Sequence, residues 1–347
     1  MRTRQFILVE KPVDEVDINK IFKLIDAELP PLKEGQVLIK LHYIAHDPAI
    51  RGWIDANSDK ERMYMPIVEP GELVKAGGLG EVVESKSTKL PVGTLVQGFM
   101  GWAEYVVMDE SECLPVQEIE GLDIALWMGP LGFTGMTAWY GLEVIRASKE
   151  DKVFVVTAAA GATGHVAVQL AKKVFGCQKV IAITSSAAKC QWVESLGADV
   201  GLNYNDPDFV EQLDRATGKQ VDVLFDNVGG WILDLMLHRM KRHSRVLACG
   251  AISTYNSRGK DPMRLPGWYE LIIQRIEVRG FVIFDAAPRY SEILQGLIQA
   301  WKDGKLKLSD GNIMKESTGL EKVPQTWLKL FNGEGRGKVV TQLVTSR

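Results

Sequence analysis

The sequence predicts an α/β protein with two folded parts, a partly closed β-barrel followed by a doubly wound parallel sheet. Three observations carry this prediction. The chain has 347 residues, enough for two domains that each bury a core. Short apolar segments separated by turn residues fill its first third. From about Gly129 onward, helical and strand-like segments alternate instead.

The first part, up to about Cys113, is mostly β structure. Turn signals interrupt it at short intervals, as at Pro70-Gly71 and Gly77-Gly78. Between the turns lie short segments rich in β-branched and aromatic residues, several of which alternate with period two. The predicted strands are residues 6–9, 36–43, 80–84, 94–99 and 103–107. Short strands with frequent turns favour a partly closed barrel.

The most informative segment is a strand, a small-residue turn and a helix in direct succession. Residues 153–156 form a continuous apolar run, typical of a strand buried on both faces. Gly161 and Gly164 allow the backbone to approach a pyrophosphate, and the next helix offers its positive N-terminus. Ala159 replaces the first glycine of the usual G-x-G-x-x-G pattern, but a second strand at 179–184 completes a βαβ unit. A helix start without a ligand is the alternative.

Further helices and strands complete the predicted parallel sheet. The predicted helices are residues 134–144, 206–217, 232–241 and 291–302, and the predicted strands are residues 221–225, 245–249 and 277–284. From about Asn312 the alternation stops, and we expect the tail to return to the first part and bring residues 333–338 near the interdomain cleft. The expected domains are residues 1–128, 129–311 and, as the returning segment, 312–347.

Composition and charge narrow the class of partner. A net charge of −3 gives no reason to expect nucleic-acid binding, so a small-molecule partner fits better. No apolar run approaches the ~20 residues that span a bilayer, and no signal peptide is visible, so we expect no membrane partner and a cytoplasmic location. The four cysteines lack C-x-x-C spacing, and we expect no metal. A metal held by His42 and His46 is the less favoured alternative.

The residues after the second strand of the βαβ unit indicate which dinucleotide binds. Sites that select NAD usually carry a carboxylate about 20 residues after the glycines, where it binds the ribose 2′-hydroxyl. This chain has Thr184, Ser185 and Ser186 there, and Lys189 follows within one helical turn. Hydroxyl groups and a cation suit a 2′-phosphate, so the sequence favours NADPH (NADP+). The alternative is that Lys189 is only a solvated surface residue.

Two further segments follow predicted strands at the edge where open α/β sheets bind ligands. Residues 225–230 (FDNVGG) follow one strand, and residues 249–256 (CGAISTYN) follow the next. They offer glycine-lined backbone, an amide, hydroxyl groups and, in Tyr255, one phenol. Ordinary turn chemistry is the alternative explanation.

Five motifs stand in order along the chain: HDPAIRG (46–52), AAAGATG (158–164), LGAD (196–199), FDNVGG and CGAISTYN. Together they resemble the zinc-independent medium-chain dehydrogenase/reductase superfamily, and within it the alkenal double-bond reductase and leukotriene B4 dehydrogenase/prostaglandin reductase group. The resemblance covers essentially the whole chain. It implies a GroES-like N-terminal domain, a Rossmann domain and a homodimer.

The resemblance also implies a reaction, the NADPH-dependent reduction of the carbon–carbon double bond of α,β-unsaturated aldehydes or ketones. Hydride reaches the β-carbon, and donors that polarise the carbonyl suffice without a metal. Tyr255 is the candidate catalytic donor, and packing against the cofactor is its alternative role. Three functions compete with this one: NADPH:quinone reduction, a non-catalytic dinucleotide-binding role and, least favoured, a zinc alcohol dehydrogenase.

The motifs and the resemblance together assign the site residues. The expected cofactor-binding residues are Pro48, Gly161, Ala162, Thr163, Gly164, Ser185, Ser186, Lys189, Tyr204, Asn227, Cys249, Gly250, Ala251, Ile252, Ser253, Tyr255, Phe281, Val282, Ile283 and Gly335. The expected substrate-pocket residues are Ala49, Trp53, Tyr64, Trp102, Tyr255 and Phe284. For the two tryptophans and Tyr64, core packing is an equal alternative. Many members carry tyrosine at the positions of Ala49 and Ile273 and asparagine at that of Gly335, so we expect a different substrate pocket.

Overall fold

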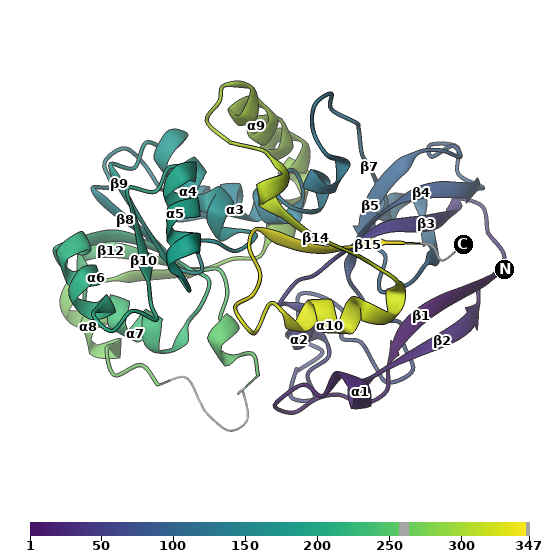
Figure 1. The fold of residues 1–347 in the computed structure, drawn as a ribbon, viewed down its shortest axis with the longest axis horizontal. Coiled ribbons are helices and arrows are strands. Elements are labelled where there is room, and N and C mark those ends of the chain that lie inside the picture. Colours follow the sequence, from purple (N-terminus) through teal and green to yellow (C-terminus); the bar gives the residue numbers. More distant parts are fainter. Residues whose placement is uncertain (257–263, 345–347) are drawn as a thin grey trace. The chain divides into compact units, whose positions relative to one another are not determined.

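The computed structural model describes residues 1–256 and 264–344 (Figure 1). These residues form two compact units. Unit 1 comprises Met1–Met128, Asn256 and residues 313–344, and unit 2 comprises Gly129–Tyr255 and residues 264–312. The chain therefore starts in unit 1, passes through unit 2 and returns to unit 1 at residue 313. The expected domains, residues 1–128, 129–311 and the returning segment 312–347, stay a prediction.

Unit 1 is the GroES-like, partly closed barrel that the sequence predicts. Its main sheet has the order β14-β15-β3-β4-β5-β7 with β6 paired to β3, and β1 and β2 form a separate two-stranded sheet. The strands are β1 (Arg2–Leu8), β2 (Phe22–Glu28), β3 (Gln36–Ala45), β4 (Gly77–Ser85), β5 (Leu95–Phe99), β6 (Tyr105–Asp109), β7 (Leu114–Pro115), β14 (Ile313–Thr318) and β15 (Lys338–Leu343). The helices are α1 (Ile18–Ile21), α2 (Ile50–Trp53) and α10 (Val323–Leu328), with 3₁₀ turns at Glu110–Glu112, Ile124–Met128 and Leu320–Lys322.

Strand β3 is the strand on which this barrel closes. Its first half lies between β4 and β6, whereas its last residues pair with β15, and all these pairings are antiparallel. Val37, Ile39 and Leu41 alternate along it and point into the core. One long strand with three partners lets the sheet curve back on itself.

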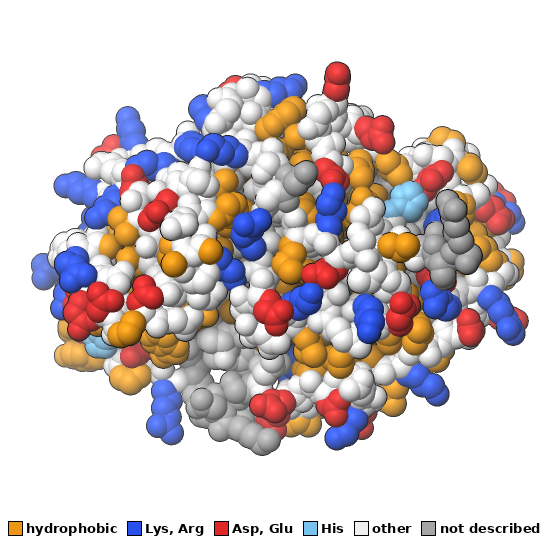
Figure 2. Space-filling model, viewed as in Figure 1, with side chains coloured by type: hydrophobic (Ala, Val, Ile, Leu, Met, Phe, Trp, Pro, Cys, Tyr) orange, Lys and Arg blue, Asp and Glu red, His pale blue; other side chains and the backbone are white. Residues whose placement is uncertain are grey.

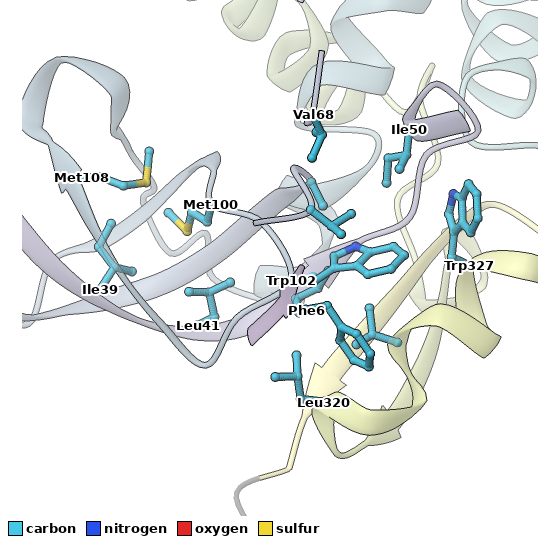
Figure 3. Packing of buried hydrophobic residues seen from close by; sticks show 14 of the residues in the cluster. Phe6, Ile39, Leu41, Ile50, Val68, Met100, Trp102, Met108, Leu320 and Trp327 are labelled. Atoms are coloured by element: carbon cyan, nitrogen blue, oxygen red, sulfur yellow. The ribbon is translucent and has the colours of Figure 1, made fainter. Parts of the chain in front are cut away.

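An aromatic cluster lies at the centre of this core (Figure 3). The ring of Trp102 lies 4.8 Å from that of Phe22 and 6.0 Å from those of Phe6 and Trp327, all edge-to-face. Such pairs contribute about 0.5–1.5 kcal/mol each beyond the burial of their area. Trp327 belongs to α10, so the C-terminal segment completes a core that β1 and β2 begin.

Unit 2 is the predicted Rossmann domain, with a six-stranded parallel sheet in the order β10-β9-β8-β11-β12-β13. The strands are β8 (Val153–Val156), β9 (Lys179–Thr184), β10 (Val200–Asn203), β11 (Val221–Asp226), β12 (Met240–Ala248) and β13 (Glu277–Gly280). The helices are α3 (Phe133–Val144), α4 (Gly164–Lys173), α5 (Ala187–Leu196), α6 (Phe209–Thr217), α7 (Gly230–Leu237), α8 (Trp268–Gln274) and α9 (Tyr290–Lys302), with 3₁₀ turns at Ile252–Thr254, Ile283–Arg289 and Asp310–Asn312.

The strand order reverses at β8. The chain runs outward from β8 to β9 and β10, then returns to place β11 on the other side of β8 and continues to β12 and β13. Every residue of β11 is buried, as expected for a central strand with both faces covered. The carboxyl ends of β8 and β11 therefore form the topological switch point, where folds of this kind bind ligands.

The structure corrects three predicted elements. The predicted strand 277–284 stops at Gly280, since its partner β12 ends opposite it at Ala248, and a 3₁₀ turn begins at Ile283. The predicted end of the helix 232–241 was wrong, because α7 ends at Leu237 and β12 begins at Met240. The strand predicted at 103–107 lies at Tyr105–Asp109, where pairing with β3 sets its register.

The surface carries charges of both signs. On the face shown in Figure 2, Lys and Arg side chains are interspersed with Asp and Glu side chains. Ion pairs such as Lys172–Asp199 and Arg289–Glu143 join them on unit 2. Within residues 1–256 and 264–344, no helix has the length and apolar character that crossing a membrane requires.

Candidate functional site

The turn between β8 and α4 has the close backbone packing of a dinucleotide turn. Ala158 adopts a φ of 46°, in the left-handed region. A Cβ at Gly164 would lie 2.3 Å from the Ala158 carbonyl oxygen, so only glycine fits there. A Cβ at Gly161 would lie 3.1 Å from the same oxygen, which is tight but not forbidden. Gly164 thus serves the packing of helix on strand, and Gly161 borders the open side of the turn.

The start of α4 offers backbone donors. The N–H groups of Ala162, Thr163 and Gly164 precede the first bond into this helix, in which the N–H of His165 donates to the Gly161 carbonyl. His165 is fully buried, with Nδ1 2.8 Å from the Gly161 carbonyl oxygen, and burial lowers its pKa to about 4. The imidazole is therefore neutral at pH 7. Three N–H groups at the positive end of a helix fit a pyrophosphate.

Polar side chains also gather after β9. The Ser186 hydroxyl caps α5 by accepting from the N–H of Lys189, and the Lys189 ammonium donates to the Ser185 hydroxyl at 3.1 Å. The N–H of Tyr204 donates to Thr184 at the end of β9. The structure thus brings together the residues predicted for the 2′-phosphate. Asn205, which sequence reasoning missed, donates its amide to the Ser185 carbonyl at 2.9 Å.

A buried carboxylate ends β11. Asp226 is 2% exposed and accepts hydrogen bonds from the Thr157 hydroxyl at 2.7 Å and from the N–H groups of Val228 at 3.1 Å and Gly229 at 2.9 Å. Burial raises the pKa of Asp226, and the three hydrogen bonds oppose that shift. Sequence reasoning gave Asp226 no role, although an acidic residue at the end of an apolar strand is a signal for one.

Asn227, the predicted nicotinamide-side residue, is held from two directions. Its backbone N–H donates to the Thr157 hydroxyl at 2.8 Å, and its side-chain Nδ2 donates to the Thr157 carbonyl at 2.7 Å. Its backbone carbonyl accepts from Ile252 at 3.3 Å. Asn227 is therefore fixed at the carboxyl end of the sheet.

The loop after β12 packs against the loop after β11. The Ser253 hydroxyl donates to the Val228 carbonyl at 2.7 Å, and a Cβ at Gly230, whose φ is 56°, would lie 2.6 Å from that hydroxyl oxygen. The Tyr255 hydroxyl accepts from the N–H of Ala251 at 3.3 Å. Tyr255 thus lies in a loop that its neighbours order.

The remaining predicted residues of unit 2 are placed as follows. Burial raises the pKa of the Cys249 thiol to about 12, so it is not ionised near pH 7. Phe281 packs edge-to-face on Tyr140 at 5.8 Å, and Phe284 lies 6.3 Å from Phe133. The half-buried residues Gly250, Val282 and Ile283 flank these segments, and Ile273 on α8 is exposed.

In unit 1, the predicted substrate residues have different environments. Trp53 is buried and donates its indole N–H to the hydroxyl of Tyr64, which is 47% exposed. Trp102 has no exposed surface, which places it in the core and favours the packing alternative. Half-buried Ala49 packs against the same core, and Pro48 precedes it before α2. A Cβ at Gly335 would lie 3.1 Å from Val339.

The histidines of the less favoured metal site face different partners. His46 is 1% exposed, with Nε2 2.8 Å from the Thr341 hydroxyl, and burial together with Lys338 and Lys329 lowers its pKa to about 3. His42 lies beside Glu81. Among residues 1–256 and 264–344, no group of three or more His, Cys, Asp or Glu side chains is arranged to hold a metal ion.

Two family models match the chain. The model described as the N-terminal domain of oxidoreductase matches residues 4–116, and the model described as zinc-binding dehydrogenase matches residues 162–299. The first match lies in unit 1 and the second in unit 2. The description of the second model names zinc, but a description does not identify metal ligands in this chain.

Relatives match over nearly the full length. An uncharacterized membrane protein of Saccharomyces cerevisiae is 33% identical, covering 93% of this chain and 91% of its own. The NADPH-dependent curcumin reductase of Escherichia coli is 32% identical (99% and 97%), and prostaglandin reductase 1 of Bos taurus is 32% identical (93% and 94%). The crystal structure of CurA in complex with NADPH from Vibrio vulnificus is 30% identical, with a TM-score of 0.88 over 99% of this chain and all of its own.

The fold, the ordered motifs and these matches agree. The barrel and the Rossmann sheet are those of the oxidoreductase relatives, and the dinucleotide turn lies at the switch point of the sheet. The chain belongs to the zinc-independent medium-chain dehydrogenase/reductase superfamily, in the group of the alkenal double-bond and prostaglandin reductases.

Proposed function

We propose that this chain is an NADPH-dependent reductase of carbon–carbon double bonds conjugated to an aldehyde or ketone. The observation that carries the proposal is the carboxyl edge of three neighbouring strands, β9, β8 and β11. There lie the Ser185–Lys189 pair, the N–H groups of residues 162–164 at the start of α4, and the Asn227 amide. These groups suit the 2′-phosphate, the pyrophosphate and the nicotinamide half of one extended dinucleotide. The names of the curcumin and prostaglandin reductases suggest the reaction class.

The cofactor, when bound, supplies a hydride to the β-carbon of the substrate. The chain's own residues hold and orient it. Gly161 lets the pyrophosphate approach the backbone, and the residues after β9 include no carboxylate that would repel a 2′-phosphate. NADPH is therefore preferred over NADH, with Lys189 supplying the cation.

Tyr255 is proposed to stabilise the substrate. Hydride addition leaves negative charge on the carbonyl oxygen, which needs a hydrogen-bond donor. The N–H of Ala251 donates to the Tyr255 oxygen at 3.3 Å, which ties the phenol to its own loop. Packing against the cofactor is the alternative role.

The variant Tyr255→Phe separates these two roles. If Tyr255 is a donor, loss of its hydroxyl lowers kcat by about a hundredfold, and the affinity for NADPH stays unchanged. As a packing residue, phenylalanine keeps the ring and leaves kcat near the wild-type value. Steady-state kinetics with a fluorescence titration of NADPH decide between them.

The substrate is proposed to be a medium-chain or aromatic enone. Ala49 replaces a larger side chain of many family members, and Tyr64, held by the indole N–H of buried Trp53, exposes an aromatic ring in unit 1. An apolar wall with few polar groups suits such substrates.

The test of the function is NADPH oxidation with a panel of enals and enones, a quinone and a simple ketone, with NADH in parallel and the product identified by mass spectrometry. We expect a saturated aldehyde or ketone as product and slower turnover with NADH. Turnover of quinone alone identifies a quinone reductase instead. Saturable NADPH binding without turnover of any acceptor contradicts the proposal and favours a binding role.

The expected homodimer is proposed to form through unit 2. Strand β13 is an edge of the six-stranded sheet, and Val278 on it is 48% exposed. On α8, Trp268, Tyr269 and Ile272 are each at least 59% exposed. An unpaired edge beside apolar side chains suits a twofold contact. Light scattering at micromolar concentration tests it: a monomer overturns the proposal, whereas a dimer that Val278→Lys dissociates supports it.

A further inference from the structure

Thr157 and Asp226 form a buried pair at the point where the strand order reverses. Thr157 directly follows β8, and Asp226 ends the neighbouring strand β11. Thr157 has no exposed surface and Asp226 is 2% exposed. A 2.7 Å hydrogen bond runs from the Thr157 hydroxyl to Asp226 Oδ1. The pair is therefore part of the rigid sheet and not of a surface loop.

The directions of the hydrogen bonds in this pair are determined. An ionised Asp226 carries no proton, so the Thr157 hydroxyl donates to it, and the Thr157 oxygen accepts from the backbone N–H of Asn227 at 2.8 Å. Asp226 must then accept from Thr157, and it also accepts from the N–H groups of Val228 and Gly229. Three donors converge on this one side chain, which suits a carboxylate and leaves no room for the NH₂ of an amide.

The same residues determine how Asn227 is oriented. Its Nδ2 donates to the Thr157 carbonyl at 2.7 Å, so its Oδ1 is the side-chain atom left to face elsewhere. Among the described residues, no donor forms a hydrogen bond with Asn227 Oδ1. The side chain thus presents an acceptor. A ribose hydroxyl or the carboxamide NH₂ of a nicotinamide complements it, whereas a phosphate oxygen does not.

We propose that Thr157 and Asp226 are positioning residues that fix Asn227 as a hydrogen-bond acceptor for the nicotinamide half of the dinucleotide, an inference that rests on the proposed function. Neither residue touches the ligand. Thr157 holds both the backbone and the amide of Asn227, and Asp226 holds Thr157 together with the next two residues of the loop.

The test compares two ligands of the full-length protein, NADPH and 2′,5′-ADP, which lacks the nicotinamide half. In Thr157→Val the hydroxyl is replaced by a methyl group of similar size, and in Thr157→Ser it is kept. We expect T157V to raise the Kd of NADPH about tenfold or more, and T157S to change it by less than about twofold. The Kd of 2′,5′-ADP stays within about twofold of the wild-type value for both. Fluorescence titration measures NADPH, and calorimetry measures 2′,5′-ADP.

A matched control lies on the same strand. Asp222, at the other end of β11, is 3% exposed and accepts from the N–H groups of Lys152 and Val153. Asp226→Asn is expected to weaken NADPH as T157V does, whereas Asp222→Asn lowers the midpoint of urea unfolding and leaves both ligand affinities unchanged.

Three outcomes overturn the inference. T157V that binds NADPH like the wild type shows that the pair does not position Asn227. Equal losses of NADPH and 2′,5′-ADP affinity show general damage to the fold and not positioning. Wild-type protein that binds 2′,5′-ADP but gains no affinity from the nicotinamide half removes the basis of the inference, whereas wild-type protein that binds neither ligand contradicts the proposed function itself.

Discussion

The two ends of the parallel sheet treat buried carboxylates differently. At the amino end, Asp222 is paired with the ammonium of Lys241, and Asp151 with the guanidinium of Arg245. At the carboxyl end, the donors to the Asp226 carboxylate among the described residues are a hydroxyl and two N–H groups. A cation neutralises a buried charge, whereas neutral donors stabilise and orient the carboxylate without cancelling its charge. The ion pairs at the amino end thus stabilise the fold, and the hydrogen bonds at the carboxyl end position a few polar groups.

Removing a cation from the amino end gives the largest expected effect. Arg245→Ala leaves Asp151, which is 3% exposed and whose pKa burial already raises, without its charge partner. It also frees the carbonyls of Ile145 and Arg146. We expect a loss of about 3 kcal/mol in the free energy of unfolding, measured in urea. NADPH affinity measured well below the unfolding transition should stay within about twofold, and a tenfold loss would break the comparison.

Adding a methyl group to the carboxyl end separates packing from binding. Gly164→Ala meets the Ala158 carbonyl at 2.3 Å and is expected to cost about 2–3 kcal/mol of stability as well as NADPH affinity. Gly161→Ala meets it at 3.1 Å, so it should weaken NADPH while stability changes little. Gly280→Ala, with nothing within 4 Å, is the silent control. Equal effects of all three on urea unfolding and NADPH titration would show that the turn is not specially packed.

Acid provides a smaller effect. Burial lowers the pKa of His165 to about 4, against about 6.5 in an unfolded chain. Between these values the unfolded chain binds a proton that the folded protein does not, so the free energy of unfolding falls as pH falls below about 6.5. By pH 5 the loss is about 2 kcal/mol for this residue. His165→Gln should make the dependence between pH 7 and 5 shallower, and His46 in unit 1, whose pKa burial lowers to about 3, contributes in the same direction. A wild-type profile that is already flat contradicts both assignments.

The last contrast concerns reactivity and not stability, at two thiols, one at each end of the sheet. Cys177 precedes β9 and Cys249 follows β12, and burial raises the pKa of both to about 12. In the folded protein at pH 8, both should react with iodoacetamide about a thousandfold more slowly than an ordinary thiol of pKa 8.5. Mass spectrometry locates the adducts, and labelling in urea is the control. Rapid labelling of Cys249 alone would show that the carboxyl end opens.

Much of the fold follows from local pattern. The strands at 153–156 and 179–184 have the predicted bounds. Short runs rich in β-branched residues between turn residues favour strands, and the turn residues mark where the strands end. Strand β2 (FKLIDAE) and β10 (VGLN) went unpredicted, since neither carries a clear period, and their partners β1 and β9 define them. The end of β13 was missed for the same reason. Strand β13 stops where its partner β12 stops, and the residues of β13 alone do not indicate that point.

The candidate site was predictable where one motif supplies all its parts. The glycine turn and the Ser185–Lys189 pair are local in sequence. Asp226 and Thr157 are 69 residues apart, and only the parallel pairing of β8 with β11 brings them together. Trp102 illustrates the opposite case, since aromatic character alone does not distinguish a pocket wall from a core residue.

The discontinuity of unit 1 has a consequence for its synthesis. His46, at the end of β3, finds its hydrogen-bond partner Thr341 only 295 residues later. At about 5–20 residues per second on the ribosome, that interval lasts about 15–60 s. Unit 2 ends at Asn312, so all its segments emerge before β15 does. Meanwhile β3 has an open edge, the feature through which nascent chains pair with one another. Strand β15, which is made after all of unit 2, is therefore the strand that covers this edge of the barrel.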